Sequence, residues 1–210
     1  MAVPFDRTSL RSGEEPITGT KQCLSDYWRW AHSDLLNNTE RGVLAEYLVG
    51  LATNSIAEYS RTEWDAYDLV TPEGITIEVK SAAYVQSWEQ ERPSRISFSV
   101  KESSAWDPVS HRYSAKKKRQ AQVYVFCVFK SPDKATADPL DTKQWDFYVV
   151  NTDDLNKALG HQQTMALSTL KTAVKHTQVS FSGLGTAVQD SLTGAKSVLP
   201  TQESPPRVYP

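Results

Sequence analysis

Cysteine, histidine and long apolar stretches are scarce in this chain, and each scarcity excludes a class of protein. The 210 residues include two cysteines, Cys23 and Cys127, which are too few and too isolated for a disulfide framework or a zinc site. The four histidines show no metal-ligand spacing. No apolar run is long enough to span a bilayer, and the N-terminus lacks the apolar region of a signal peptide. We therefore expect a cytoplasmic protein without a membrane partner.

An excess of charge of either sign is also lacking. The sequence has 23 Lys and Arg residues against 25 Asp and Glu residues, which gives a formal net charge of −2. A protein with this balance must bind nucleic acid through a local patch of cations. A charge run is ordinarily a solvated surface, but it also attracts a phosphate backbone without reading base sequence. The densest patch lies within residues 101–121 and consists of Arg112, Lys116, Lys117, Lys118 and Arg119.

The length fits one globular domain with a tail at each end. Residues 1–22 are mostly polar, with two prolines and two glycines, and are predicted to be a flexible arm. Residues 193–210 contain four prolines and are predicted to be a tail. We therefore expect a single folded domain over residues 23–192.

Apolar residues at helical spacing predict helices, and alternating or continuous apolar runs predict strands. The run 123–129 is apolar throughout, which is typical of a central strand covered on both faces. Helices are expected at 24–37, 40–52, 153–159, 168–174 and 182–192, and strands at 65–70, 75–80, 95–100, 123–129 and 145–150. One stripe of the second helix is expected to face the core, and it consists of Val43, Leu44, Tyr47, Leu48 and Leu51.

The stretch 64–81, which reads WDAYDLVTPEGITIEVKS, is predicted to be the β-hairpin around which the domain is organised. The Pro-Glu-Gly sequence at 72–74 supplies the turn, because proline fixes φ and glycine accepts a positive φ. A hairpin centred there places Asp68 directly across from Glu78. The period of two along a strand then puts Lys80 on the same face.

Two carboxylates and an amine on one patch of sheet have a specific chemistry. Paired carboxylates repel each other unless a cation or a proton lies between them. Adjacent carboxylates are ligands for a hard divalent cation such as Mg²⁺. An amine beside that metal can orient or help to deprotonate a water, which would allow metal-assisted hydrolysis of a phosphodiester.

Asp68, nine intervening residues and then Glu78-Val79-Lys80 resemble the motif of the PD-(D/E)xK nuclease superfamily. The resemblance covers about residues 40–150. It implies an α/β fold with a restriction-endonuclease-like core, in which helices flank a mixed sheet of four or five strands. The superfamily normally has a helix between its third and fourth core strands, whereas here only residues 101–121 are available, and Pro108 interrupts them.

The resemblance implies a Mg²⁺-dependent endonuclease, for which Mn²⁺ can substitute, that acts on DNA more readily than on RNA. In that family pattern, Asp68, Glu78 and the carbonyl of Val79 hold the metal. Lys80 positions and activates the attacking water. Asp65 is the alternative acid if a β-bulge shifts the hairpin register by one residue. A homodimer is expected if both strands of a duplex are cut symmetrically.

Residues on either side of the hairpin are further candidates. The helix pattern alone predicts that Glu46 is solvated. Many superfamily members, however, carry an acid near the metal at the matching position. Arg41 begins the same helix and is expected to contact a phosphate or to pair with an acid. Gln86 follows the Glu-x-Lys strand, where some superfamily members place a polar residue close to the substrate.

Two further interpretations remain open. A catalytically silent nucleic-acid-binding or regulatory module could keep the same fold, although such a module has no reason to hold Asp68, Glu78 and Lys80 together. In an unrelated α/β domain these three would be ordinary surface residues. Metal binding distinguishes both interpretations from a nuclease.

Overall fold

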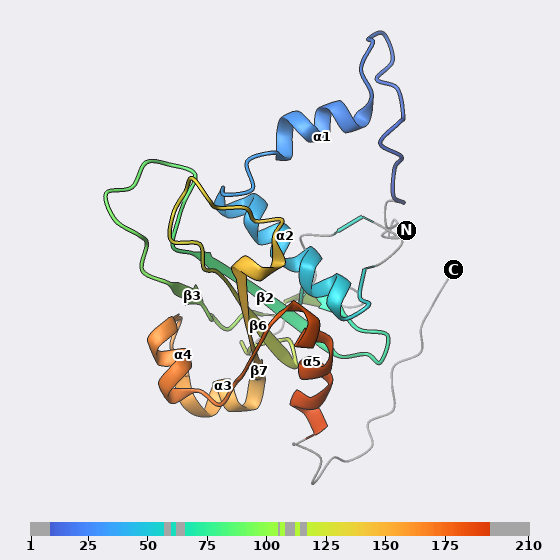
Figure 1. Cartoon of the computed structure of the whole chain (residues 1–210). Coiled ribbons are helices and arrows are strands. Elements are labelled where there is room, and N and C mark those ends of the chain that lie inside the picture. The colour runs from blue at the N-terminus through green and yellow to red at the C-terminus, as the bar shows by residue number, and fades with distance from the viewer. Residues whose placement is uncertain are drawn as a thin grey trace.

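The computed structural model describes residues 9–56, 60–61, 66–104, 106–107, 112–113 and 117–193 of the chain, with the backbone alone at 106–107 and 112–113. The fold is α/β, and helices flank a mixed five-stranded sheet, as the sequence predicts (Figure 1). Residues 1–8 and 194–210 lie outside the described residues, so the arm and the tail stay predictions.

The central sheet has the spatial order β1-β2-β6-β7-β9. Three of its contacts are antiparallel, and β2 with β6 is the parallel pair. Four of the strands lie where alternating or continuous apolar patterns predict them, and β9 was not predicted. The strands are β1 (Leu69–Val70), β2 (Thr76–Ala83), β6 (Val123–Phe129), β7 (Trp145–Asn151) and β9 (Thr177–Val179).

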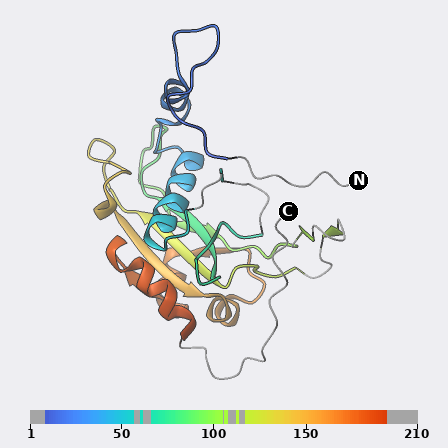
Figure 2. The same cartoon turned by 90° about the vertical axis from the view of Figure 1, so that its right-hand side faces the viewer.

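Every residue of β6 is buried, because helices cover the sheet on both sides. On one face, Ile77 and Val79 of β2 pack in a core with α2 (Asn38–Ala52) and α5 (Leu184–Thr193). Figures 1 and 2 show these two helices on the same side of the sheet. The opposite core contains Ala82 of β2 together with side chains of α3 and α4.

The remaining helices match the predicted ones within a few residues. Asn151 caps α3, since its side chain accepts a hydrogen bond from the Asp153 N–H at 2.8 Å. They are α1 (Leu24–His32), α3 (Thr152–Leu159) and α4 (Leu167–Ala173), with short 3-10 turns at Thr142–Gln144 and Phe181–Gly183.

Helix α1 ends five residues earlier than predicted. The Asn37 side chain accepts a hydrogen bond from the Thr39 N–H at 2.9 Å and so caps the start of α2 instead. None of the residues of α1 is buried, and Figure 1 shows this helix standing apart from the sheet.

The predicted orientation of α2 was partly wrong. Leu48 of the expected stripe is buried, but Val43, Tyr47 and Leu51 are exposed. The helix instead turns Ala45 and Val49 to the sheet, both with no exposed surface. Small side chains let a helix approach a sheet closely, and this close packing outweighs the larger apolar area of the stripe.

The predicted strand at 95–100 forms as β3 (Ser97–Ser99), but outside the central sheet. It pairs with the unpredicted β8 (Thr164–Ala166), because β2 and β6 pair directly and leave no place between them. A third small sheet joins β4 (Trp106–Asp107) and β5 (Arg112–Tyr113). In the part of 84–122 that the structure describes, no helix occurs.

Gly185 lies where α5 meets the end of α2, and it predicts a sharp sensitivity to substitution. A Cβ at this position would stand 2.3 Å from the backbone oxygen of Ala52, which neither helix can avoid without moving. We expect Gly185→Ala to lower the free energy of unfolding by about 1–3 kcal/mol, measured by urea denaturation. Gly42→Ala is the control, since a Cβ there meets nothing within 4 Å. It should leave stability unchanged or raise it by up to about 1 kcal/mol. Equal effects of the two substitutions would contradict this packing.

Candidate active site

The predicted hairpin forms with the predicted turn. Gly74 has a φ of +85°, and its N–H donates to the Thr71 carbonyl at 2.8 Å. The two strands pair with Leu69 opposite Ile77, and extension of this register by one residue places Asp68 opposite Glu78. The alternative acid, Asp65, lies outside the described residues.

Asp68 is attached to the edge of β2 by a main-chain contact. Its Oδ2 accepts a hydrogen bond from the Val79 N–H at 2.7 Å. Because the N–H and C=O groups of one strand residue point to the same side, the Val79 carbonyl also points toward this edge. Strand β1 begins at Leu69, so the Asp68 side chain occupies the position where a longer β1 would have continued the ladder.

Lys80 and Glu78, two residues apart on β2, form an ion pair. The Lys80 Nζ lies 2.5 Å from Oε1 of Glu78, and both side chains are partly exposed. Tyr124 of β6 is in register with Glu78. Burial and the nearby Glu78 carboxylate raise the pKa of the Tyr124 hydroxyl, so this group stays protonated.

Glu46 projects from α2 and is held by an arginine that the sequence analysis did not identify. Arg61 binds both carboxylate oxygens of Glu46, and the contact from Nη2 to Oε1 measures 2.9 Å. The Glu46 side chain is 14% exposed and that of Arg61 40%. The segment around Arg61 has no helical or strand period that could have drawn attention to it.

These acids act on one another electrostatically. Burial, followed by the charge of Glu78, raises the pKa of Asp68 to about 7, and Glu46 adds to the rise. The hydrogen bond from Val79 and the charge of Lys80 oppose it. Glu78 and Glu46 each bond a cationic side chain, whereas the carboxylate of Asp68 accepts a hydrogen bond from the main-chain N–H of Val79. Asp68 is thus the acid whose negative charge is least compensated.

Arg41 and Gln86 meet inside the protein. Arg41 is 3% exposed and donates to the Leu36 carbonyl at 2.7 Å and to Oε1 of Gln86 at 3.3 Å. Gln86 is also buried and donates to the Ala83 carbonyl at 3.0 Å. Burial lowers the pKa of Arg41. This network joins the start of α2 to the segment after β2, and a contact of either side chain with nucleic acid stays a prediction.

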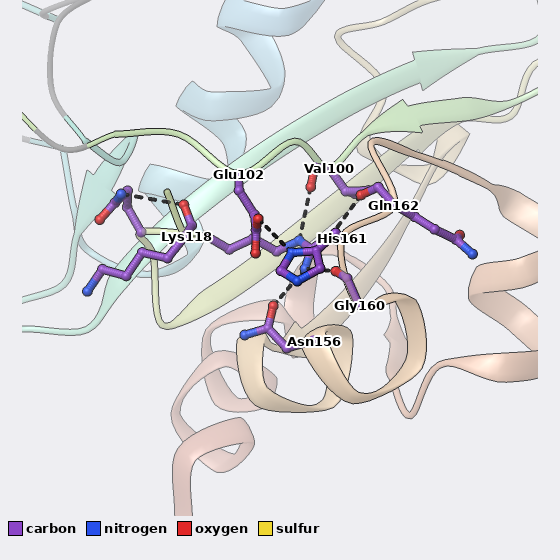
Figure 3. Close-up of polar contacts among 9 residues, drawn as sticks. Val100, Glu102, Lys118, Asn156, Gly160, His161 and Gln162 are labelled. Carbon is purple, nitrogen blue, oxygen red and sulfur yellow. Dashed lines mark hydrogen bonds and ion pairs between the residues drawn. The ribbon is translucent and has the colours of Figure 1, made fainter. Parts of the chain in front are cut away.

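The basic patch does not form one surface. Lys117 and Lys118 are exposed, but Arg119 is 4% exposed and serves as a buried hub. Its guanidinium donates to three main-chain carbonyls and one side-chain oxygen, at 2.7–3.0 Å, and the acceptors converge in Figure 3: Val100, Asn156, Gly160 and Gln162. Arg119 is therefore placed to hold the β3 segment against the end of α3 rather than to face solvent. The Arg112 side chain and Lys116 lie outside the described residues.

The comparison with protein families shows to which family the chain belongs. The model of the bacteriophage T4 endonuclease IV family matches residues 15–169. The chain belongs to this family. A comparison with curated proteins gave no match.

The part that matches the bacteriophage T4 endonuclease IV family contains the whole hairpin, α2 and the Arg119 hub. This family is one of nucleases, which agrees with the class of activity predicted from Asp68, Glu78 and Lys80.

Among the described residues, no helix is long and apolar enough to cross a membrane.

The raised pKa of Asp68 predicts how the metal-free protein responds to pH. The pKa of Asp68 in the folded state lies above the unfolded value of 3.8, so the fold favours the protonated carboxyl. The free energy of unfolding therefore falls as the pH rises from about 4 to about 7 and the carboxyl ionises. In EDTA at pH 8, Asp68→Asn should therefore raise the free energy of unfolding by about 1–3 kcal/mol, with little change at pH 4. Asp190→Asn, on the exposed face of α5, is the matched control and should have little effect at either pH. Destabilisation by Asp68→Asn at pH 8 would contradict the expected charge repulsion.

The Arg119 hub predicts a stability effect rather than a binding effect. Arg119→Ala leaves buried acceptors without a donor and should lower the free energy of unfolding by about 3 kcal/mol, measured by urea denaturation. Lys118→Ala, one residue away and exposed, should change stability by no more than about 0.5 kcal/mol. An Arg119→Ala protein of wild-type stability would show that the hub contributes nothing.

Proposed function

We propose that this protein is a Mg²⁺-dependent endonuclease that cleaves DNA at the Asp68, Glu78 and Lys80 site, in the manner of the PD-(D/E)xK superfamily. The observation that carries the proposal is the arrangement at the edge of β2. The Asp68 carboxylate is bonded to the Val79 N–H, the Val79 carbonyl points the same way, and Glu78 lies across the register. Family membership supports the endonuclease class.

The donor set fits a hard divalent cation. Two carboxylates and a carbonyl are oxygen ligands of the kind that Mg²⁺ takes, with water completing the octahedron. Asp68 is the least compensated acid, and a cation there would relieve its repulsion by Glu78 and Glu46. In the described part of the chain, no group of three or more His, Cys, Asp and Glu side chains could hold a metal. The proposed site therefore depends on the main-chain oxygen of Val79 as its third protein ligand.

Each residue has a defined role in hydrolysis. When bound, Mg²⁺ would supply charge that favours the transition state at the scissile phosphate and would acidify water. Lys80 donates hydrogen bonds, so it would orient the attacking water and stabilise the negative charge that develops. Glu78 pairs with Lys80 through Oε1, so its second oxygen could bind the cation while Lys80 stays beside the site.

Glu46 would act from α2 on the same water. Both of its oxygens accept hydrogen bonds from Arg61, but a carboxylate oxygen has more than one lone pair. Glu46 can therefore hold a water without releasing Arg61. DNA as the substrate and a dimer for symmetric cleavage both belong to the proposal.

The alternative is a nucleic-acid-binding module without turnover. It would keep Lys80 and Glu78 as a permanent surface ion pair, which is worth only about 0–1 kcal/mol at a partly exposed position. The family of the chain favours the nuclease. Dependence of cleavage on the divalent cation separates the two functions.

Lys80→Ala should reduce DNA cleavage by at least about a hundredfold, because it removes the group that positions the water. The assay uses supercoiled, linear and single-stranded DNA with Mg²⁺, with Mn²⁺ and with EDTA. Wild-type cleavage should require the metal.

Lys175→Ala is the matched control, since it removes an exposed lysine that lies outside both the hairpin and the basic patch. It should retain cleavage, and a thermal melt of each variant checks the fold. A folded Lys80→Ala protein that cleaves like the wild type would exclude the proposed role of Lys80.

A further inference from the structure

We infer that Arg61 is a substrate-binding residue that contacts a backbone phosphate next to the carboxylate pair, with Glu46 holding its guanidinium in place. The inference rests on the proposed function and deepens it, because it names a group that would bring a polyanion to an acidic site. The ligand class is the phosphodiester backbone of a nucleic acid.

The geometry of the pair supports this role. Arg61 binds Glu46 through two separate nitrogens, Nε and Nη2, which fixes the plane of the guanidinium. The Glu46 side chain is 14% exposed and the Arg61 side chain 40%, so the arginine is the outer residue of the pair. A planar guanidinium presents its donors as a fork that also matches the oxygens of a phosphate.

The charges around the hairpin give the physical reason. Glu46 and Glu78 both lie close enough to Asp68 to act on its carboxylate. Three acids would repel a phosphodiester, so a cation must face the incoming strand. Lys80 is bonded to Glu78, and Arg61 is bonded to Glu46, so each of these two acids has a cation beside it.

The other basic residues considered for phosphate binding are placed differently. Arg41 and Arg119 are almost completely buried, and each donates to acceptors of the interior. Lys117 and Lys118 are exposed but lie in the segment before β6, away from the hairpin turn in sequence. Among the described arginines, Arg61 combines a side chain that is 40% exposed with a direct bond to a candidate active-site acid.

The test measures binding rather than cleavage. Fluorescence anisotropy of labelled single-stranded and duplex oligonucleotides is recorded in EDTA over a series of NaCl concentrations, so that no turnover occurs. A residue that neutralises one phosphate contributes about one to the slope of log affinity against log salt. Arg61→Ala should make this slope shallower by about one and weaken binding several-fold at low salt. Arg61→Lys should keep the slope while losing part of the affinity.

Arg11→Ala is the matched control, because Arg11 also pairs with a glutamate, Glu15, on an exposed surface far from the hairpin in sequence. It should leave the slope unchanged. A folded Arg61→Ala protein with the wild-type slope would show that Arg61 is only a structural partner of Glu46, and would overturn the inference alone. Failure of the wild-type protein to bind either oligonucleotide would overturn the proposed function, and the inference with it.

Discussion

The parallel pairing of β2 with β6 is the constraint on which the rest of the structure depends. Seven residue pairs in register join the two strands, from Ile77 opposite Val123 to Ala83 opposite Phe129. A parallel pair cannot be closed by a tight turn, so the chain leaves the sheet after β2 and returns only at β6. The segment between them contributes β3, β4 and β5 to the two small sheets. It also contains Arg119, which donates to the Val100 carbonyl directly after β3. Strand β2 lies between β6 and the two-residue β1, and the candidate site lies on the β1 side.

At this edge, charge is distributed unevenly. Glu46 and Glu78 have cationic partners, while Asp68, whose carboxylate is affected by the charge of both, has a main-chain donor. Such an arrangement is costly in a resting protein, and the raised pKa of Asp68 expresses that cost. A site that must receive a cation has to be under-neutralised before the cation arrives, so the cost is consistent with the proposed role. The family of the chain independently supports a nuclease activity.

The sequence predicted the hairpin, the register that sets Asp68 opposite Glu78, and the buried strand β6, because each depends on short-range patterns in the chain. It did not predict which side of α2 is buried, since Ala45 and Val49 are selected by close packing against β2 rather than by apolar area. Strands β8 and β9 were missed because three residues are too few to show a period. Arg61 and the burial of Arg119 were missed for another reason. Both depend on partners distant in sequence, and the sequence does not show whether a charged side chain faces water or buried carbonyl groups.

The lengths of the two edge strands have a consequence for self-association. Strand β1 has two residues and β9 has three, so the outermost strands of the central sheet are both short. Sheets that end in this way offer little template for β-strand addition by a second chain, which is how many proteins avoid aggregation. The shortness of β1 thus protects against polymerisation. It also lets the Val79 N–H bond a side chain, the Asp68 carboxylate, in place of a neighbouring strand.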